Sequence, residues 1–485
     1  MGKQKTSRRT FWLSKYFKEN DYRIRLLTFS GIYILLSAFY LWAYPDPLFT
    51  GDTGSYVYSA LKGVPNGVRP IGYSWFLEWL HFFSSSVGFV VFMQYLMLGL
   101  ALLFFYLTVD YLFDLKKSIS LSLTVLLAFC PAQLFVANSF MSDTLFIIYT
   151  LFWLSGLFWM LKKPDYSVFA VNLLLLFLAI NTRYIGLFYP TITIGVLFYS
   201  YRRKAWVPAL IVIATIFTII RYTSNEMSKY YSVDTFTEFS GWATANNASI
   251  MVPHLDLRSE VFSDKTLQYV NQQLAEFPDS VFSPQSVLNT HFIWRNNYPG
   301  KVIMTEIRRI NPGLPYTRTW LITGKVLGKY GRELILRHPF EFMRYFVLLN
   351  TAQVFYPEID LGSYQHDSKT DKAVLAYYGT NSRKFRARFD FFGNLINSLT
   401  KPLNLLLWAV LAGIVSIGIW KKVWLSMTPL NNSILILTLL FLLMYLGGSI
   451  LTHPVQYRYL LPVHPLMLML CAVILHKTLE QKEGN

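Results

Sequence analysis

Long apolar runs are the feature that most constrains this chain, because roughly 20 consecutive apolar residues are enough to cross the hydrocarbon core of a bilayer. Of its 485 residues, 53% are hydrophobic and 15% are charged, and the hydrophobic residues form blocks instead of alternating with polar ones. A soluble protein is excluded. Because helices satisfy their own backbone hydrogen bonds in lipid, we expect an all-α polytopic membrane protein.

The apolar runs predict about ten transmembrane helices, with boundaries accurate to a few residues. The expected spans are 27–44, 87–107, 118–137, 142–161, 168–182, 185–200, 206–221, 402–420, 432–451 and 459–476.

The net charge of +17 could indicate a nucleic-acid partner, but the basic residues sit next to the apolar runs, as they do in short cytoplasmic loops. We therefore exclude nucleic acid and expect membrane lipids as the surroundings. The same rule places the N-terminus in the cytoplasm, with residues 1–26 as a basic tail and a first span that is retained, since no small-residue cleavage site follows it. The basic residues that flank the apolar runs are Lys116-Lys117, Lys162-Lys163, Arg202-Arg203-Lys204 and Lys421-Lys422.

This topology divides the chain into a transmembrane core at 27–221, a mixed, mostly helical extracytoplasmic domain at 222–400, and C-terminal transmembrane helices at 401–485. The first outer loop of the core covers residues 45–86. The stretch 340–356 is moderately apolar, but it contains Arg344 and Asn350 and would invert every later loop if it crossed. It is expected to be an interfacial or re-entrant helix.

Asp52 is the first candidate for chemistry. It lies in the first outer loop, between Gly51 and the nearby Gly54, on a turn that could approach a ligand closely. Its carboxylate could accept a proton from an attacking hydroxyl. The alternative is structural, since an Asp here could cap the helix that begins near Ser55. Arg69 lies in the same loop, before Pro70.

Further ionisable residues fall at the outer ends of other spans, where a shared membrane level indicates a functional site. Arginines there suit a phosphate, because the guanidinium offers paired donors in a fixed fork. Structural roles are open alternatives: Asp143 could be a helix cap and the arginines could be interface anchors. Trp294 could contact a sugar or be a buried tryptophan in a surface turn. The ionisable residues are Asp143, Arg183, His453 and Arg458.

Several short motifs, in this order, resemble the membrane-embedded GT-C glycosyltransferases, which use polyprenyl-phosphate-linked sugars. The likeness covers residues 27–221 and, more loosely, 450–465; residues 222–400 match no pattern of that family. The motifs are GDTGSY, G-x-R-P-I-G-Y-S, M-S-D-T-L-F, N-T-R-Y-I-G-L and Q-Y-R-Y-L-L-P.

The resemblance implies a GT-C-like fold and an inverting transfer of a sugar from a polyprenyl phosphate to a lipid, glycan or protein acceptor, at the periplasmic side of a bacterial inner membrane. It gives Asp52 the role of catalytic base. Many relatives have two adjacent acidic residues at this point, whereas Asp52 has Gly51 and Thr53 beside it. A divalent metal is therefore possible but not favoured, and no other cofactor is expected.

Positive charge near the leaving phosphate would stabilise the transition state. The candidates for this role are Arg69, Arg183, Arg458 and His453, with Tyr56 and Asp143 as further site residues. Two other functions stay open. A flippase or transporter of a lipid-linked saccharide could use the same basic cluster, although transporters usually place charges near the bilayer centre. A glycan polymerase or ligase would transfer a chain instead of one sugar.

Overall fold

The computed structural model describes residues 19–359, 368–379 and 388–483. It is 79% helix, with no strand in those residues, and its only extended pairing there consists of isolated parallel bridges from Leu48 to Ser139 and from Glu358 to Gln456. The predicted all-α class is confirmed. Residues 1–18, which belong to the predicted basic tail, lie outside the described residues.

Seven helical segments within the described ranges are long and apolar enough to cross a membrane, as a multi-pass membrane protein requires. The helix α9 (Tyr166–Thr182) is apolar but shorter. Two predicted spans, 185–200 and 206–221, fall in a single apolar segment, and α23 (His464–Glu483) covers the last predicted span, 459–476, only from residue 464 onward. The seven are Asn20–Ala43, Val87–Phe113, Lys117–Ala137, Ser142–Lys162, Tyr184–Tyr231, Gly393–Trp420 and Pro429–Thr452.

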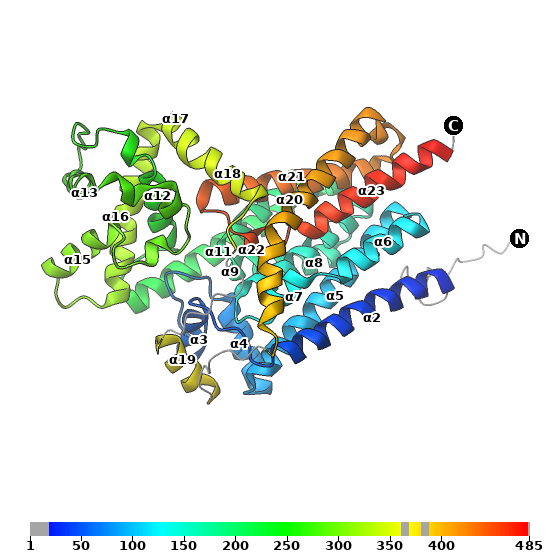
Figure 1. The fold of residues 1–485 in the computed structure, drawn as a ribbon, viewed down its shortest axis with the longest axis horizontal. Coiled ribbons are helices and arrows are strands. Elements are labelled where there is room, and N and C mark those ends of the chain that lie inside the picture. Colours follow the sequence, from blue (N-terminus) through cyan, green and yellow to red (C-terminus); the bar gives the residue numbers. More distant parts are fainter. Residues whose placement is uncertain (1–18, 360–367, 380–387, 484–485) are drawn as a thin grey trace, which may run out of the picture.

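The apolar helices pack side by side in one bundle (Figure 1). Their bounds are α2 (Asn20–Ala43), α5 (Val87–Phe113), α6 (Lys117–Ala128), α7 (Pro131–Ala137), α8 (Ser142–Lys162), α9 (Tyr166–Thr182), α10 (Tyr189–Tyr201), α11 (Trp206–Tyr231), α20 (Asp390–Trp420), α21 (Pro429–Thr452) and α23 (His464–Glu483), joined in part by the short turns η1 (Tyr184–Phe188), η2 (Arg202–Ala205) and η7 (Val423–Ser426).

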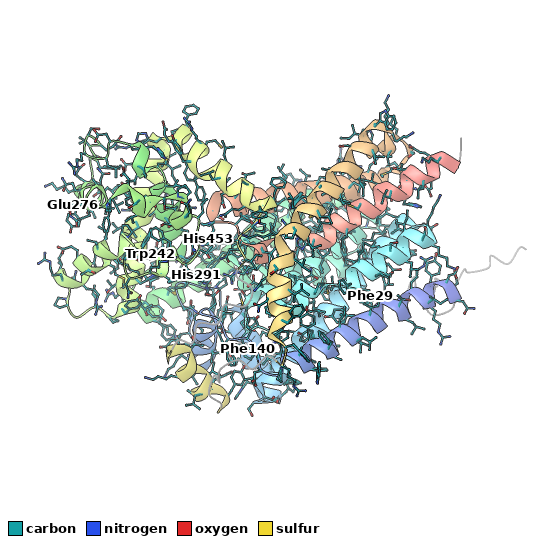
Figure 2. The ribbon with its side chains drawn as sticks, viewed as in Figure 1. Phe29, Phe140, Trp242, Glu276, His291 and His453 are labelled. Atoms are coloured by element: carbon teal, nitrogen blue, oxygen red, sulfur yellow. The ribbon has the colours of Figure 1, made fainter. Side chains whose placement is uncertain are left out.

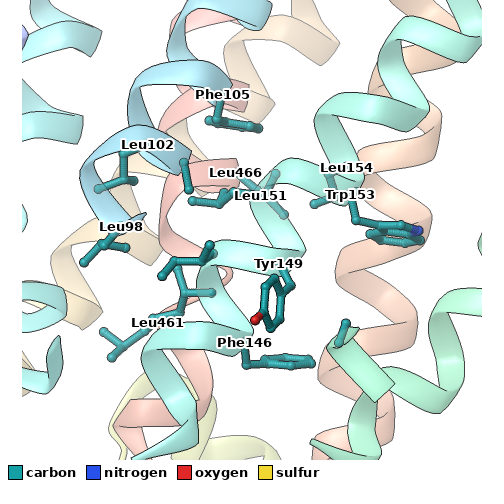
Figure 3. Packing of buried hydrophobic residues seen from close by; sticks show 14 of the residues in the cluster. Leu98, Leu102, Phe105, Phe146, Tyr149, Leu151, Trp153, Leu154, Leu461 and Leu466 are labelled. Carbon is teal, nitrogen blue, oxygen red and sulfur yellow. The ribbon is translucent and has the colours of Figure 1, made fainter. Parts of the chain in front are cut away.

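Helix α8 forms the centre of the bundle. Phe146, Trp153 and Leu154 on α8 are almost fully buried, and Figure 3 shows Leu151 of the same helix beside Leu466 of α23 while Trp153 points to the other side. A helix that is apolar on all sides is expected to lie in the interior of a bundle. The first residues of α8 are therefore held rigidly, which matters because they carry one of the candidate site residues.

The predicted span 118–137 is broken near its middle. Helix α6 ends at Ala128 and α7 begins at Pro131. Proline lacks an N–H group and disfavours helical geometry in the residue before it. Phe129 and Cys130 therefore leave the helix, and Pro131 occupies the first position of the next one, where its missing donor has no cost.

A second group of helices forms a lobe at one end of the bundle (Figure 1), with its own hydrophobic core. We call it the helical lobe. Its elements are α12 (Phe239–Ser249), η3 (Val252–His254), α13 (Lys265–Ala275), η4 (Asp279–Phe282), α14 (Pro284–Val287), η5 (Phe292–Trp294), α15 (Gly300–Ile310) and α16 (Tyr316–Arg337).

The lobe is built around an unusually close contact between α12 and α16. A Cβ atom added at Gly241 would lie 2.0 Å from the carbonyl oxygen of Gly324, and one at Gly331 would lie 2.7 Å from the Cα of Ala245. Only glycine allows the two backbones to approach so closely. The lobe lies within residues 222–400, the range predicted to be mostly helical. That range also includes residues outside the described ones.

The stretch predicted as an interfacial helix is one continuous helical run, α17 (Pro339–Phe342), the π-helical turn η6 (Met343–Val347) and α18 (Leu348–Phe355). Asn350 on α18 is fully buried. Its side chain donates to the carbonyl oxygens of Ile450 and His453 and accepts from the backbone N–H of Val455. Through these hydrogen bonds the helical run clamps the loop that follows α21. The position of the run in the headgroup layer of a bilayer stays a prediction.

Four short helices lie where the bundle meets the lobe (Figure 1). They are α3 (Thr53–Lys62) and α4 (Gly72–Phe83) in the first predicted loop, α19 (Ser368–Tyr378), and α22 (Tyr457–Leu460) after the clamped loop.

Candidate functional site

Five of the predicted site residues converge at this junction in one ion-pair cluster, which consists of Asp52, Arg69, Asp143, Arg183 and Arg458. Arg69 Nη2 lies 2.5 Å from Asp52 Oδ1, and Arg458 Nη1 lies 3.5 Å from Asp52 Oδ2. The same Arg458 atom lies 3.8 Å from Asp143 Oδ2, and Arg183 is paired with the other oxygen of Asp143. Residues from four separate parts of the sequence therefore share one set of charges.

The first loop reaches the cluster because its backbone is attached to the segment before α8. The N–H of Leu48 donates to the carbonyl of Asn138, and the N–H of Phe140 donates to the carbonyl of Leu48. The hydroxyl of Thr53 donates to the carbonyl of Phe140 over 3.1 Å. These bonds fix the turn that carries Asp52 beside the start of α8, which carries Asp143.

Asp52 occupies the position before α3, but its side chain makes no capping hydrogen bond with that helix. Both carboxylate oxygens face arginines instead. The first turn is supported by neighbouring hydroxyls, since Thr53 accepts from the N–H of Thr50 and Ser55 donates to the carbonyl of Asp52. The capping alternative for Asp52 is therefore wrong.

Arg69 is positioned by an Asn-centred turn. The side-chain oxygen of Asn66 accepts from the backbone N–H of Arg69 at 2.8 Å, while its amide donates to Ser59 Oγ at 2.9 Å. A Cβ at Gly67 would lie 2.1 Å from a methyl group of Leu321 on α16, so the loop packs directly against the helical lobe. The turn thus sets the direction of Arg69 toward Asp52.

Arg458 is positioned by the clamped loop. Its Nε donates to Gln456 Oε1 at 2.8 Å, and Gln456 in turn donates to Thr290 of the lobe. The backbone N–H of Tyr457 donates to the carbonyl of Glu358 at 3.0 Å. Figure 2 labels His291 in the lobe and His453 in the clamped loop, near the two ends of this contact between Thr290 and Gln456. The lobe therefore helps to hold Arg458.

Asp143 lies in the first turn of α8, but the residue before that helix is Met141. The Asp143 side chain is 4% exposed and is paired with Arg183, whose guanidinium carbon lies 4.8 Å above the ring of Tyr459. Arg458 is 10% exposed. The alternative of a helix cap is therefore wrong for Asp143, and Arg183 and Arg458 are paired with carboxylates.

The cluster contains three guanidinium groups and two carboxylates, so it retains positive charge for an anionic ligand. Burial raises the pKa of Asp52, but the charges on Arg69, Arg458 and Arg183 outweigh burial and hold this pKa below its usual value. Asp52 is therefore ionised near neutral pH and is a weak base as long as its arginines stay in place.

His453 differs from the arginines in kind. Its Nδ1 lies 3.1 Å from the carbonyl oxygen of Pro454, and since a carbonyl only accepts, Nδ1 must carry the proton and leave Nε2 without one. Burial and the nearby arginines lower the pKa of His453 to about 4. The ring is neutral at pH 7, so it suits the acceptance of a hydrogen bond from a hydroxyl better than the predicted binding of a phosphate.

Tyr56 joins the first loop to α8 without a hydrogen bond to the ion-pair cluster. Its hydroxyl lies 2.8 Å from Ser142 Oγ, and burial raises the pKa of Tyr56. Tyr56 therefore positions the loop. In the described part of the chain, no group of three His, Cys, Asp or Glu residues is placed to hold a metal ion.

A small cavity of about 10 Å³ is lined in part by Arg69 and has room for about one water molecule. It reaches from the first loop to α9 and α11 and is lined in part by Asn181, Tyr184, Ile219 and Phe236.

Sequence reasoning missed the residues that position the charges, above all Asn66, Gln456 and Asn350. An Asn three residues before the Arg of an Arg–Pro pair in a loop is a turn signal that could have been read. Comparison with family models, with curated proteins and with solved structures found no match for this chain.

Proposed function

We propose that the chain is a GT-C-type membrane glycosyltransferase that moves a sugar from a polyprenyl-phosphate carrier to a hydroxyl of a lipid, glycan or protein acceptor. The observation that carries the proposal is the ion-pair cluster: a carboxylate held between two arginines, at the junction of an apolar bundle and a helical lobe. This arrangement combines a proton acceptor with cations for a leaving phosphate at the end of membrane-crossing helices.

In the proposed reaction, an acceptor hydroxyl attacks the anomeric carbon of the donor. The new C–O bond forms as the bond to the phosphate oxygen breaks, with inversion at that carbon. The hydroxyl proton passes to Asp52, and the polyprenyl phosphate leaves as an anion next to Arg69 and Arg458. The arginines stabilise the charge that develops on the leaving oxygen more strongly than they stabilise the donor.

The donor phosphate and Asp52 compete for the same guanidinium groups. Without donor, Arg69 lies 2.5 Å from Asp52 and suppresses its basicity. When a phosphate takes over the paired donors of these arginines, the carboxylate loses its partners and gains a negative neighbour, and both changes raise its pKa. Donor binding therefore activates the base.

The proposal includes ten spans with the N-terminus in the cytoplasm and with the lobe and the ion-pair cluster on the periplasmic side of a bacterial inner membrane. It is supported by the seven qualifying segments, by the shorter apolar α9, and by the lysine and arginine groups at the opposite ends of these helices from the cluster.

The test is a panel of polyprenyl-phosphate sugars offered to the full chain in nanodiscs, with donor consumption and product followed by mass spectrometry. A new glycosidic bond and free polyprenyl phosphate are expected. Movement of intact donor across a liposome membrane, without a new bond, would instead establish a flippase, and transfer of a whole chain would establish a polymerase or ligase.

A further inference from the structure

A row of stacked aromatic rings leads from the ion-pair cluster into the helical lobe. The ring of Phe239 lies 5.6 Å from the guanidinium carbon of Arg69 and stacks on the ring of His453 at 5.5 Å. Trp294 lies 6.2 Å from Phe239 with an angle of 17° between the ring planes. Trp320 follows at 6.1 Å and 2°. We call Phe239 and Trp294 the aromatic platform.

The platform differs from the rings behind it in exposure. Trp320 is 3% exposed and Trp242 is fully buried, and these two stack at 5.4 Å as part of the core of the lobe. Trp294 is 39% exposed, so it is not the buried tryptophan of a surface turn. The core of the lobe therefore leaves part of this apolar ring uncovered, where a ligand could bury it.

Polar side chains surround the exposed ring. Arg295, Asn296 and Asn297 directly follow Trp294 and are exposed, as is His291 one turn earlier. Side-chain amides offer both donors and acceptors, which match the alternating hydroxyl groups of a sugar, while the C–H face of a pyranose is apolar and packs on flat rings. An exposed aromatic ring next to side-chain amides in the chain offers both kinds of contact that a carbohydrate needs.

We infer that the aromatic platform binds a pyranose ring of the acceptor through the exposed part of Trp294, with Phe239 linking Trp294 to the ion-pair cluster, so that the acceptor class is a saccharide whose reacting hydroxyl points toward Asp52. This inference rests on the proposed transfer reaction. The acceptor is favoured over the donor sugar because the platform belongs to the lobe, while the donor's phosphate is assigned to Arg69 and Arg458 and its lipid chain to the bilayer. The neutral His453 on the other face of the array can accept a hydrogen bond from an acceptor hydroxyl.

The test measures binding of soluble disaccharides (cellobiose, maltose and chitobiose) to the full chain in nanodiscs by calorimetry, so that it needs no turnover. At least one is expected to bind. Trp294→Ala should weaken that binding about tenfold, as for the loss of one stacked ring, while Trp294→Phe restores most of it. The control is Trp206→Ala, since Trp206 is 65% exposed at the far end of α11.

The kinetic arm separates the two sources of sugar. In transfer assays Trp294→Ala should raise KM for the saccharide acceptor with little change in KM for the polyprenyl donor. Failure of all three disaccharides to bind, equal binding by Trp294→Ala and wild type, or a change confined to the donor KM would overturn the platform. Saccharide binding that depends on Trp294 without any transfer would support the platform and overturn the proposed reaction instead.

Discussion

Replacement of Asp52 by asparagine should affect binding and catalysis in opposite directions. Asparagine has nearly the same shape, but it carries no charge and cannot take up the proton of the attacking hydroxyl. Loss of a general base typically slows a reaction about 10²- to 10⁴-fold. We therefore expect turnover of the polyprenyl-phosphate donor to fall within this range while the protein still inserts and folds.

The same change should tighten donor binding. In the free protein the phosphate must displace the Asp52 carboxylate from Arg69 at 2.5 Å and from Arg458 at 3.5 Å. The side chain of Asp52 is 21% exposed, so we count only the shorter contact and take the low end of the range for a charged hydrogen bond, about 1.5 kcal/mol. This corresponds to a dissociation constant roughly tenfold lower.

The assay compares donor binding and single-turnover rates of wild type and Asp52→Asn in nanodiscs of the same lipid. Asp46→Asn is the matched control, since Asp46 lies in the same loop and has no place in the ion-pair cluster. Weaker donor binding by Asp52→Asn would refute competition between carboxylate and phosphate. Undiminished turnover would refute the role of Asp52 as base.

Three further perturbations test the cluster. Arg458→Lys should weaken donor binding by about tenfold or more in a binding assay. A lysine ammonium lacks the planar set of donors with which the Arg458 guanidinium contacts Gln456 and two carboxylates at once. Arg69→Gln should raise the pKa that governs the acidic limb of kcat/KM, because removing a cation favours the protonated form of Asp52. In wild type, the pKa of this limb in kcat/KM should lie below the usual range for Asp. The corresponding pKa in kcat, which reports the donor-bound enzyme, should be higher. Asn350→Ala should lower thermal stability by about 1–3 kcal/mol in a melting experiment, since buried backbone groups lose their partner.

The sequence alone was enough to predict the helices of the bundle, because hydropathy and helix length are set by the bilayer over each segment separately. It also indicated five charged residues that the structure brings together, since ionisable groups at span ends are rare and costly. Their pairing could not be predicted. Whether Arg458 reaches Asp52, Asp143 or water depends on the Asn350 clamp and on Gln456, and these contacts join parts of the chain that lie far apart.

The helical lobe was the least predictable part. Its close helix contact depends on glycines in α12 and α16, and such glycines indicate a near approach only once the partner helix is known. The aromatic platform could not be predicted for the same reason. Trp294 was consistent with both a buried and an exposed position until its neighbours Phe239 and Trp320 were placed.

The two carboxylates of the ion-pair cluster should contribute differently to the stability of the fold, because their surroundings differ. Asp143 is 4% exposed and paired with Arg183 inside the bundle, whereas Asp52 is 21% exposed on a loop. Removing one partner of a buried pair typically costs about 3–5 kcal/mol because it leaves the other charge uncompensated, while the partly exposed contact of Asp52 is worth about 1.5 kcal/mol, as above. Asp143→Asn should therefore lower the melting temperature in nanodiscs far more than Asp52→Asn does, even though both remove one negative charge. Equal losses of stability would mean that burial does not distinguish the two, and that Asp52 is as much a fixed counter-ion of the fold as Asp143.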